Sequence, residues 1–184
     1  VDIFEQDSEL GGKLRQVIPE ERLNREILEY EIKRVLDTGV KAFVNTKIDK
    51  NKMRALIDKY DAVVLAIGAH KPVVLPVEGN ERLIKGLDFL KAVNKGEKPK
   101  IGENVVVIGA GNAGMDVVLT AYKIGAKKVT AIDIQKPAAF EKEIEHAKEL
   151  GAEILWPCYT EKITDKGVVL KDGRVIPADT VIIS

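Results

Sequence analysis

The sequence predicts an α/β fold in three layers, with a mostly parallel sheet covered by helices. Apolar runs of strand length alternate with segments of helical periodicity along most of the 184 residues, and this alternation is typical of parallel sheets with helical crossovers. Its hydrophobic content of 45% is enough to form a sizeable core. A glycine-rich segment, residues 109–114, joins one apolar run to one helical run, which is a common connection in this fold class.

The first part of the chain reads in the order β, α, β, α, β. Gly11 and Gly12 form a flexible turn, Asn24 caps a helix, and Gly39 ends that helix. The expected elements are a strand at 1–5, a helix from Asn24 to Gly39, a strand at 41–45, a short helix at 51–59, and a buried strand at 62–67 that ends at Gly68.

Between residues 75 and 102 the periodicity fades while prolines and glycines accumulate, which favours a crossing between two units. We therefore expect one domain over residues 1–98 and a second over residues 99–184.

The second part repeats the β/α alternation. We expect strands at 105–108, 129–132 and 153–156, helices at 112–124 and 141–150, a hairpin of 168–170 with 174–177 around an Asp-Gly turn, and a strand-like run at 180–184. The chain opens within a strand, without an initiator Met, and closes on another strand-like run. We therefore expect a fragment whose first unit lacks its opening strand and turn.

Composition excludes several classes of function. Lys plus Arg (29) balance Asp plus Glu (29), so we expect no nucleic-acid or membrane partner. The sequence shows no signal peptide and no apolar run of membrane-spanning length, so we expect a cytoplasmic location. The single cysteine, Cys158, cannot form an internal disulfide. The two histidines, His70 and His146, lack the neighbouring ligands of a metal site, so we expect neither a metal nor a catalytic histidine.

The glycine-rich segment carries the sharpest chemical signal. A buried strand runs into Gly109-Ala110-Gly111-Asn112-Ala113-Gly114 and then into a helix. In a G-x-G-x-x-G turn the first glycine permits the bend, the second lets backbone approach a diphosphate, and the third lets the helix pack closely on the strand. The helix N-terminus offers amides and partial positive charge to the phosphates. Residues 109–114 are therefore expected to bind a dinucleotide in a Rossmann-like unit.

Asp133 ends the next strand, about 20 residues after the turn, where such units place the acid that binds the adenosine ribose. A carboxylate there accepts hydrogen bonds from the ribose hydroxyls and repels a 2′-phosphate. Ile134 and Gln135 follow without an arginine, although Lys136 comes next. We therefore expect NAD(H) rather than NADP(H).

The first unit carries weaker signals of the same kind. Glu5 ends a strand, the pair Gly11-Gly12 follows it, and Ala66-Ile67-Gly68 ends another strand. A strand-end acid can bind a second adenosine ribose, but Glu5 alone also fits an ordinary loop residue.

Together these segments resemble the glutamate synthase small-subunit family, within the pyridine nucleotide-disulfide oxidoreductase superfamily of flavoproteins with two dinucleotide-binding domains. The resemblance covers nearly the whole chain. It rests on Phe4-Glu5, Leu10-Gly11-Gly12-Lys13-Leu14-Arg15, Ile18-Pro19-Glu20 with Arg22-Leu23, Ala66-Ile67-Gly68-Ala69 before Lys71-Pro72, the turn at 109–114 with Met115-Asp116, and Glu143-Ile144-Glu145-His146-Ala147-Lys148.

The resemblance implies an FAD domain interrupted by an NAD(P) domain, with hydride passing from nicotinamide to flavin and electrons passing to a partner subunit or domain. It implies no catalytic side chain. By family position, the residues expected to contact FAD are Glu5, Gly12, Lys13, Leu14, Arg15, Ala66, Ile67 and Gly68.

Two departures from the family pattern shape the prediction. Many members place arginines after the second strand of the NAD(P) domain and use NADPH, whereas this chain has Asp133-Ile134-Gln135, so we expect NADH. No Cys-x-x-Cys pair is present, which disfavours disulfide reduction. As a fragment the chain is expected to bind FAD poorly. The alternatives are a ferredoxin- or thioredoxin-reductase-like enzyme with another acceptor, and an NAD-binding sensor or scaffold without turnover.

Overall fold

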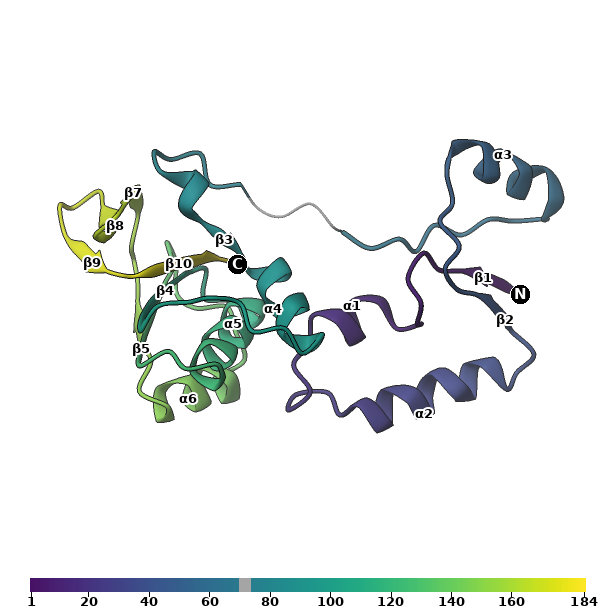
Figure 1. The fold of residues 1–184 in the computed structure, drawn as a ribbon, viewed down its shortest axis with the longest axis horizontal. Coiled ribbons are helices and arrows are strands. Elements are labelled where there is room, and N and C mark those ends of the chain that lie inside the picture. Colours follow the sequence, from purple (N-terminus) through teal and green to yellow (C-terminus); the bar gives the residue numbers. More distant parts are fainter. Residues whose placement is uncertain (70–73) are drawn as a thin grey trace. The chain divides into compact units, whose positions relative to one another are not determined.

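The computed structural model describes residues 1–69 and 74–184. The chain divides into two compact units, Val1–His70 and Lys71–Ser184, and each is described separately (Figure 1). Both units contain a parallel sheet and helices, so the predicted α/β class is confirmed. None of the helices in the described ranges is long and apolar enough to span a membrane.

The first unit has a small parallel sheet joined by helices. Its elements are β1 (Asp2–Phe4), α1 (Gly12–Gln16), α2 (Arg25–Leu36), β2 (Lys41–Phe43) and α3 (Lys50–Lys59). Strands β1 and β2 pair in parallel with Ile3 opposite Ala42. The rings of Phe4 and Phe43 stack on this pair at 5.1 Å, so an aromatic contact reinforces the two-stranded ladder.

Asparagine and aspartate fix where the two longer helices of this unit begin. The Asn24 side chain accepts a hydrogen bond from the Glu26 N–H at 2.7 Å, as the sequence predicted for the helix that became α2. Asp49 does the same at α3, where it accepts from the Asn51 and Lys52 amides at 2.9 Å. These side chains satisfy amides that have no partner inside the helix.

The buried strand expected over residues 62–67 is wrong. This segment has no regular secondary structure, and Val64, Leu65 and Ile67 are 86%, 65% and 73% exposed. A strand is stabilised by hydrogen bonds to a neighbouring backbone, and the sheet described in this unit consists of β1 and β2 alone. An apolar, β-branched composition predicted the strand, but composition does not supply a pairing partner.

The second unit is built on a five-stranded parallel sheet in the order β3-β10-β4-β5-β6. Helix α5 contacts β4, β5, α4 and α6. Its buried face includes Met115, Val117 and Val118, while Val106 and Val107 are fully buried on β4. The elements of the sheet and its helices are β3 (Ile84–Lys85), α4 (Gly86–Asn94), β4 (Asn104–Ile108), α5 (Asn112–Lys123), β5 (Lys128–Ile132), α6 (Glu141–Glu149), β6 (Glu153–Leu155) and β10 (Thr180–Ile183).

A three-stranded antiparallel sheet, β7 (Thr160–Thr164), β8 (Gly167–Leu170) and β9 (Val175–Pro177), packs on the parallel sheet. Strands β8 and β9 form the predicted hairpin, whereas β7 was not predicted. The buried residues Val168 and Leu170 of β8 join a core cluster with Val106 and Ile132 of the parallel sheet. A short 3-10 helix, η1 (Asn80–Arg82), precedes β3.

The two compact units divide earlier than the expected boundary after residue 98. Strand β3 pairs with β10, and α4 packs on α5, where Gly86 lies close to Val117. The segment 84–94 therefore belongs to the second compact unit. Strand β3 has only two residues, which is too short to produce a periodic signal in the sequence.

Candidate functional site

The glycine-rich turn lies at the edge of the parallel sheet where its strands end. Strand β4 ends at Ile108 and α5 begins at Asn112. Strands β5 and β6 lie on one side of β4, and β10 and β3 on the other, so the order of the sheet reverses at β4. Parallel α/β sheets bind ligands in the crevice that forms outside the strand ends at such a reversal.

Gly109 and Gly114 make the turn tight. Gly109 has a φ of 111°, and a Cβ built on it would lie 2.4 Å from the Ser184 carbonyl oxygen. A Cβ on Gly114 would lie 2.0 Å from the Gly109 carbonyl oxygen. Only glycine fits at either position, so these two residues set the bend and the close approach of α5 to β4.

Gly111 differs from its two neighbours because its surroundings are open. A Cβ built there would meet no atom within 4 Å, and its φ of −82° suits any residue. It is the N-cap residue of α5, and no side chain caps this helix. The first-turn amides of α5 and the positive end of its dipole therefore stand beside open space, which is the arrangement that binds phosphate groups.

Asp133 follows β5 directly and turns its carboxylate onto the glycine-rich turn. Its Oδ2 accepts a hydrogen bond from the Ala110 N–H at 2.8 Å, and its Oδ1 accepts from the Gln135 N–H at 3.1 Å. The side chain is half-buried. A carboxylate can accept about four hydrogen bonds, so Asp133 retains acceptor capacity for hydroxyl groups beside the turn.

The backbone around Asp133 is fastened to the neighbouring strand. Its N–H donates to the Leu155 carbonyl at 3.1 Å, and its carbonyl accepts from the Cys158 N–H at 2.7 Å. Trp156, the only tryptophan, lies between these two bonded positions and is 45% exposed.

The loop after Asp133 is also attached to the first residue of α5. The Asn112 side-chain oxygen accepts a hydrogen bond of 2.9 Å from the Phe140 N–H, and Phe140 is the N-cap residue of α6. Between these ends, Ile134, Gln135 and Lys136 are exposed. The sequence predicted Asn112 as part of the dinucleotide-binding turn, but it contained no signal for this contact.

In the first unit, Glu5 has a local geometry like that of Asp133. It follows β1, and its Oε1 accepts a hydrogen bond from the Asp7 N–H at 3.0 Å, two residues on. Its backbone N–H donates to the Phe43 carbonyl, which extends the pairing with β2. Both acids therefore stand at the end of a parallel strand and accept from a backbone amide two positions later.

The other residues expected near FAD lie in two separate segments of the first unit. Gly12, Lys13, Leu14 and Arg15 lie in α1. The Arg15 side chain donates to the Leu10 carbonyl at 2.7 Å and pairs with Glu9 and Glu29, so its charge is compensated within the first unit.

Ala66, Ile67 and Gly68 lie in the exposed irregular segment described above. The first unit has a cavity of about 340 Å³, and none of the residues expected to contact FAD lines it. The cavity is lined by Met53, Ile57, Tyr60, Asp61, Ala62, Val63 and Leu65.

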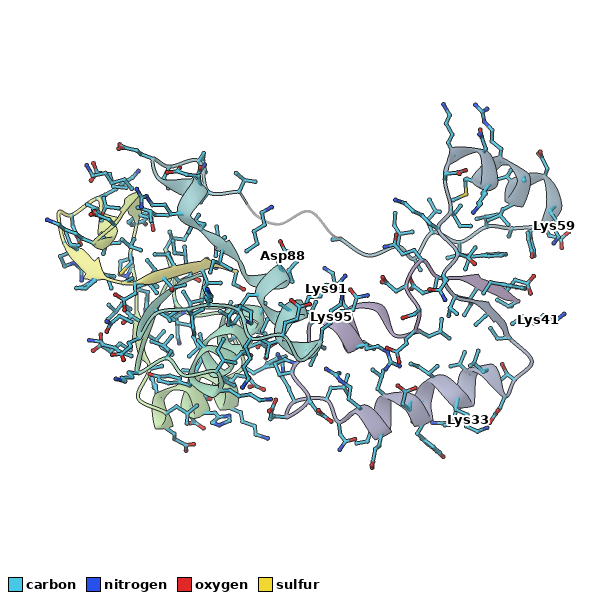
Figure 2. The ribbon with its side chains drawn as sticks, in the orientation of Figure 1. Lys33, Lys41, Lys59, Asp88, Lys91 and Lys95 are labelled. Carbon is cyan, nitrogen blue, oxygen red and sulfur yellow. The ribbon has the colours of Figure 1, made fainter. Side chains whose placement is uncertain are left out.

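Two further residues singled out in the sequence are His146 and Cys158. His146 is exposed on α6, and Cys158 is buried with its sulfur 4.0 Å from Arg174. His70, Lys71 and Pro72 lie outside the described residues. Figure 2 shows Lys33, Lys41 and Lys59 on separate elements of the first unit, Asp88 and Lys91 on α4, and Lys95 directly after it.

Comparison with known proteins gives a family match over most of the chain. The family model described as pyridine nucleotide-disulphide oxidoreductase matches residues 7–184. The putative oxidoreductase YgfK of Escherichia coli O157:H7 is 32% identical over 158 residues, which cover 83% of this chain and 15% of that protein.

Two further relatives cover more of the chain. The NAD-dependent dihydropyrimidine dehydrogenase subunit PreT of Escherichia coli O157:H7 is 30% identical, over 100% of this chain and 47% of its own length. The glutamate synthase [NADPH] small chain of Azospirillum brasilense is 29% identical, over 92% of this chain and 39% of its own length. The chain spans less than half the length of each of these three relatives.

Among solved structures, a 2-naphthoyl-CoA reductase complex superposes with a TM-score of 0.79 at 23% identity, covering all of this chain and 29% of the reductase chain. Reduced CoADR-RHD of Bacillus anthracis superposes with a TM-score of 0.61, also at 23% identity, over all of this chain and 38% of that one. These likenesses show that the fold is shared.

Proposed function

Because the chain belongs to the pyridine nucleotide-disulphide oxidoreductase family, we propose that it is part of an FAD- and NADH-dependent oxidoreductase and that its second unit binds the ADP half of NADH. One observation carries this proposal. The Asp133 carboxylate accepts the Ala110 N–H beside Gly111, whose surroundings are open. A diphosphate and a ribose can therefore be bound side by side at this edge of the sheet.

The diphosphate lies against the turn at 109–114 in this proposal. Gly111 admits its backbone approach, and the amides of Asn112 and Ala113 at the start of α5 donate to its oxygens. Because Gly114 and Gly109 are in contact, the helix N-terminus is held rigidly behind the phosphates. Such preorganisation lowers the cost of binding.

Asp133 selects the cofactor. Its carboxylate accepts from the adenosine ribose hydroxyls, and its charge opposes a 2′-phosphate. The names of the relatives differ on this point, since PreT is named as NAD-dependent and the Azospirillum small chain is named for NADPH. The preference for NADH is therefore proposed from Asp133 and from the exposed Ile134 and Gln135 that follow it.

The first unit contributes part of the FAD site. We assign the FAD ribose to Glu5, because its position at the end of β1 matches that of Asp133 after β5. The proposed FAD contacts of Gly12–Arg15 and Ala66–Gly68 rest on the family resemblance alone. When bound, the cofactors supply the redox chemistry, with a hydride moving from nicotinamide to flavin. This chain's residues bind and orient them.

A partner protein or domain accepts the electrons in this proposal. Support comes from the names of two relatives, a small chain of glutamate synthase and a subunit of a dihydropyrimidine dehydrogenase. The substrate reduced at the end of the pathway follows from that partner.

Competition between NADH and ADP-ribose tests the proposal, because both contain the ADP half. We expect ADP-ribose to displace NADH from the chain with simple competitive behaviour, and nicotinamide mononucleotide to displace it weakly. Displacement by nicotinamide mononucleotide alone would mean that the turn at 109–114 is not the main binding site.

A further inference from the structure

The loop between β5 and α6 is fastened to the glycine-rich turn at both of its ends. At one end, the Asp133 carboxylate accepts the Ala110 N–H at 2.8 Å. At the other end, the Phe140 N–H donates to the Asn112 side-chain oxygen at 2.9 Å. The segment between them, residues 134–139, follows the proposed ribose-binding acid and includes Lys136, the nearest cation in the sequence.

From these two contacts we infer that Asn112 is a positioning residue for cofactor choice. By holding Phe140, it fixes where residues 134–139 lie relative to the turn that binds the diphosphate. The inference rests on the proposed function, because it assigns a role at the same site. Asn112 acts through the loop, in addition to the amide it contributes at the start of α5.

The surroundings of the two residues explain why this one contact matters. Asn112 opens α5, in which Gly114 is buried and Met115 fully buried, so its side chain extends from a rigid base. Phe140 is 65% exposed, and α6 has no side-chain cap. Packing of the Phe140 ring therefore adds little to the attachment. Helix α6 as a whole is held against α5, with Ala147 fully buried, and the hydrogen bond to Asn112 fixes the position of its N-cap residue.

Losing this attachment makes the site less selective between the two dinucleotides. With the loop held, Asp133 stands at the ribose and the exposed Lys136 stays where the loop geometry places it. Without this hydrogen bond the loop is held less tightly just before α6, and Lys136 can move toward a 2′-phosphate and compensate its charge. Loss of one hydrogen bond of this kind should lower the preference for NADH over NADPH by about threefold to tenfold.

The experiment measures two quantities on the complete 184-residue chain. Amide hydrogen exchange of Phe140 without ligand reports on the contact, and the ratio of the NADPH and NADH dissociation constants reports on cofactor choice. Asn112→Ala removes the acceptor. Asn112→Asp retains an acceptor oxygen at the same place. Asn80→Ala is the matched control, because it removes an exposed asparagine that donates to the Leu75 carbonyl in the same unit.

We expect Asn112→Ala to accelerate Phe140 exchange and to lower the preference for NADH. Asn112→Asp should keep Phe140 protected and should not lower the preference, even if its charge weakens both dinucleotides, and Asn80→Ala should change neither quantity. An unchanged preference or unchanged Phe140 exchange in Asn112→Ala would overturn the role of Asn112 and leave the proposed function standing. Absence of dinucleotide binding by the unaltered chain would overturn the proposed function, and the inference with it.

Discussion

The Asp133 carboxylate accepts a hydrogen bond from the Ala110 N–H at 2.8 Å, across a separation of 23 residues in the sequence. This contact joins the end of β5 to the turn that follows β4. The acid proposed for the ribose is therefore hydrogen-bonded directly to the turn whose amides are proposed for the diphosphate. A change at either residue should affect the other part of the site.

Replacing Asp133 with asparagine should shift the cofactor preference toward NADPH. The amide keeps one oxygen that can accept from Ala110, but it no longer opposes a 2′-phosphate. Because hydrogen bonds to a charged group are worth more than neutral ones, we expect the preference for NADH to fall about tenfold or more. Titration of the variant and the unaltered chain with both dinucleotides measures this ratio.

The control for that variant is Asp165→Asn, which removes the charge of an exposed acid between β7 and β8. It should leave the ratio unchanged. If Asp133→Asn bound both dinucleotides with the affinities of the unaltered chain, Asp133 would not be the residue that binds the ribose and opposes the 2′-phosphate.

Gly111 and Gly114 should respond in opposite ways to an added side chain. A Cβ at Gly111 meets open space, whereas a Cβ at Gly114 meets the Gly109 carbonyl oxygen at 2.0 Å. Gly111→Val should therefore abolish NADH binding and change the free energy of unfolding by less than about 1 kcal/mol. Gly114→Ala should lower it by about 1–3 kcal/mol through overpacking. Urea unfolding and NADH titration separate the two effects.

A folded Gly111→Val variant that binds NADH with normal affinity would contradict the first expectation. That result would show that the open space beside Gly111 is not where the diphosphate lies. A Gly114→Ala variant as stable as the unaltered chain would show that α5 can shift away from β4 at little cost.

The sequence predicted the second unit better than the first because its signals there were local and strong. The turn at 109–114 stands between a fully apolar strand and a long helix, so periodicity and turn chemistry agree. Asn24 identified the start of α2 for the same reason. Family membership could also be inferred from these motifs, and the match over residues 7–184 confirms it.

What could not be predicted depends on contacts between distant residues. Residues 62–67 have the composition of a strand but belong to neither strand of the β1-β2 sheet. Strand β3 has two residues and owes its existence to β10, about a hundred residues later. The contact between Asn112 and Phe140 involves a side chain and a backbone amide, and no periodicity or motif reports it.

The pH dependence of stability should reveal the contact between the starts of β4 and β10. The Asn104 backbone N–H and side-chain amide both donate to Asp179 Oδ2, at 2.8 and 2.9 Å, and these bonds lower the pKa of Asp179 below its ordinary value of 3.8. The ionised form is therefore favoured in the folded state. Its stabilisation is present above pH 3.8 and is lost as the pH falls through the lower folded-state pKa.

We expect Asp179→Asn to be less stable than the unaltered chain at pH 7, and the difference to shrink once the pH falls below about 4. Thermal unfolding of both proteins over this range measures the difference. A difference that stays constant down to acid pH would mean that ionisation of Asp179 does not contribute.

The most direct test of the central claim is titration of the chain with NADH and with NADPH, followed through the fluorescence of Trp156. This single tryptophan lies between two positions that are hydrogen-bonded to the Asp133 backbone, so it reports from beside the proposed ribose site. Our account predicts saturable binding of NADH, with NADPH at least about tenfold weaker. Tighter binding of NADPH, or no saturable change with either dinucleotide, would contradict it.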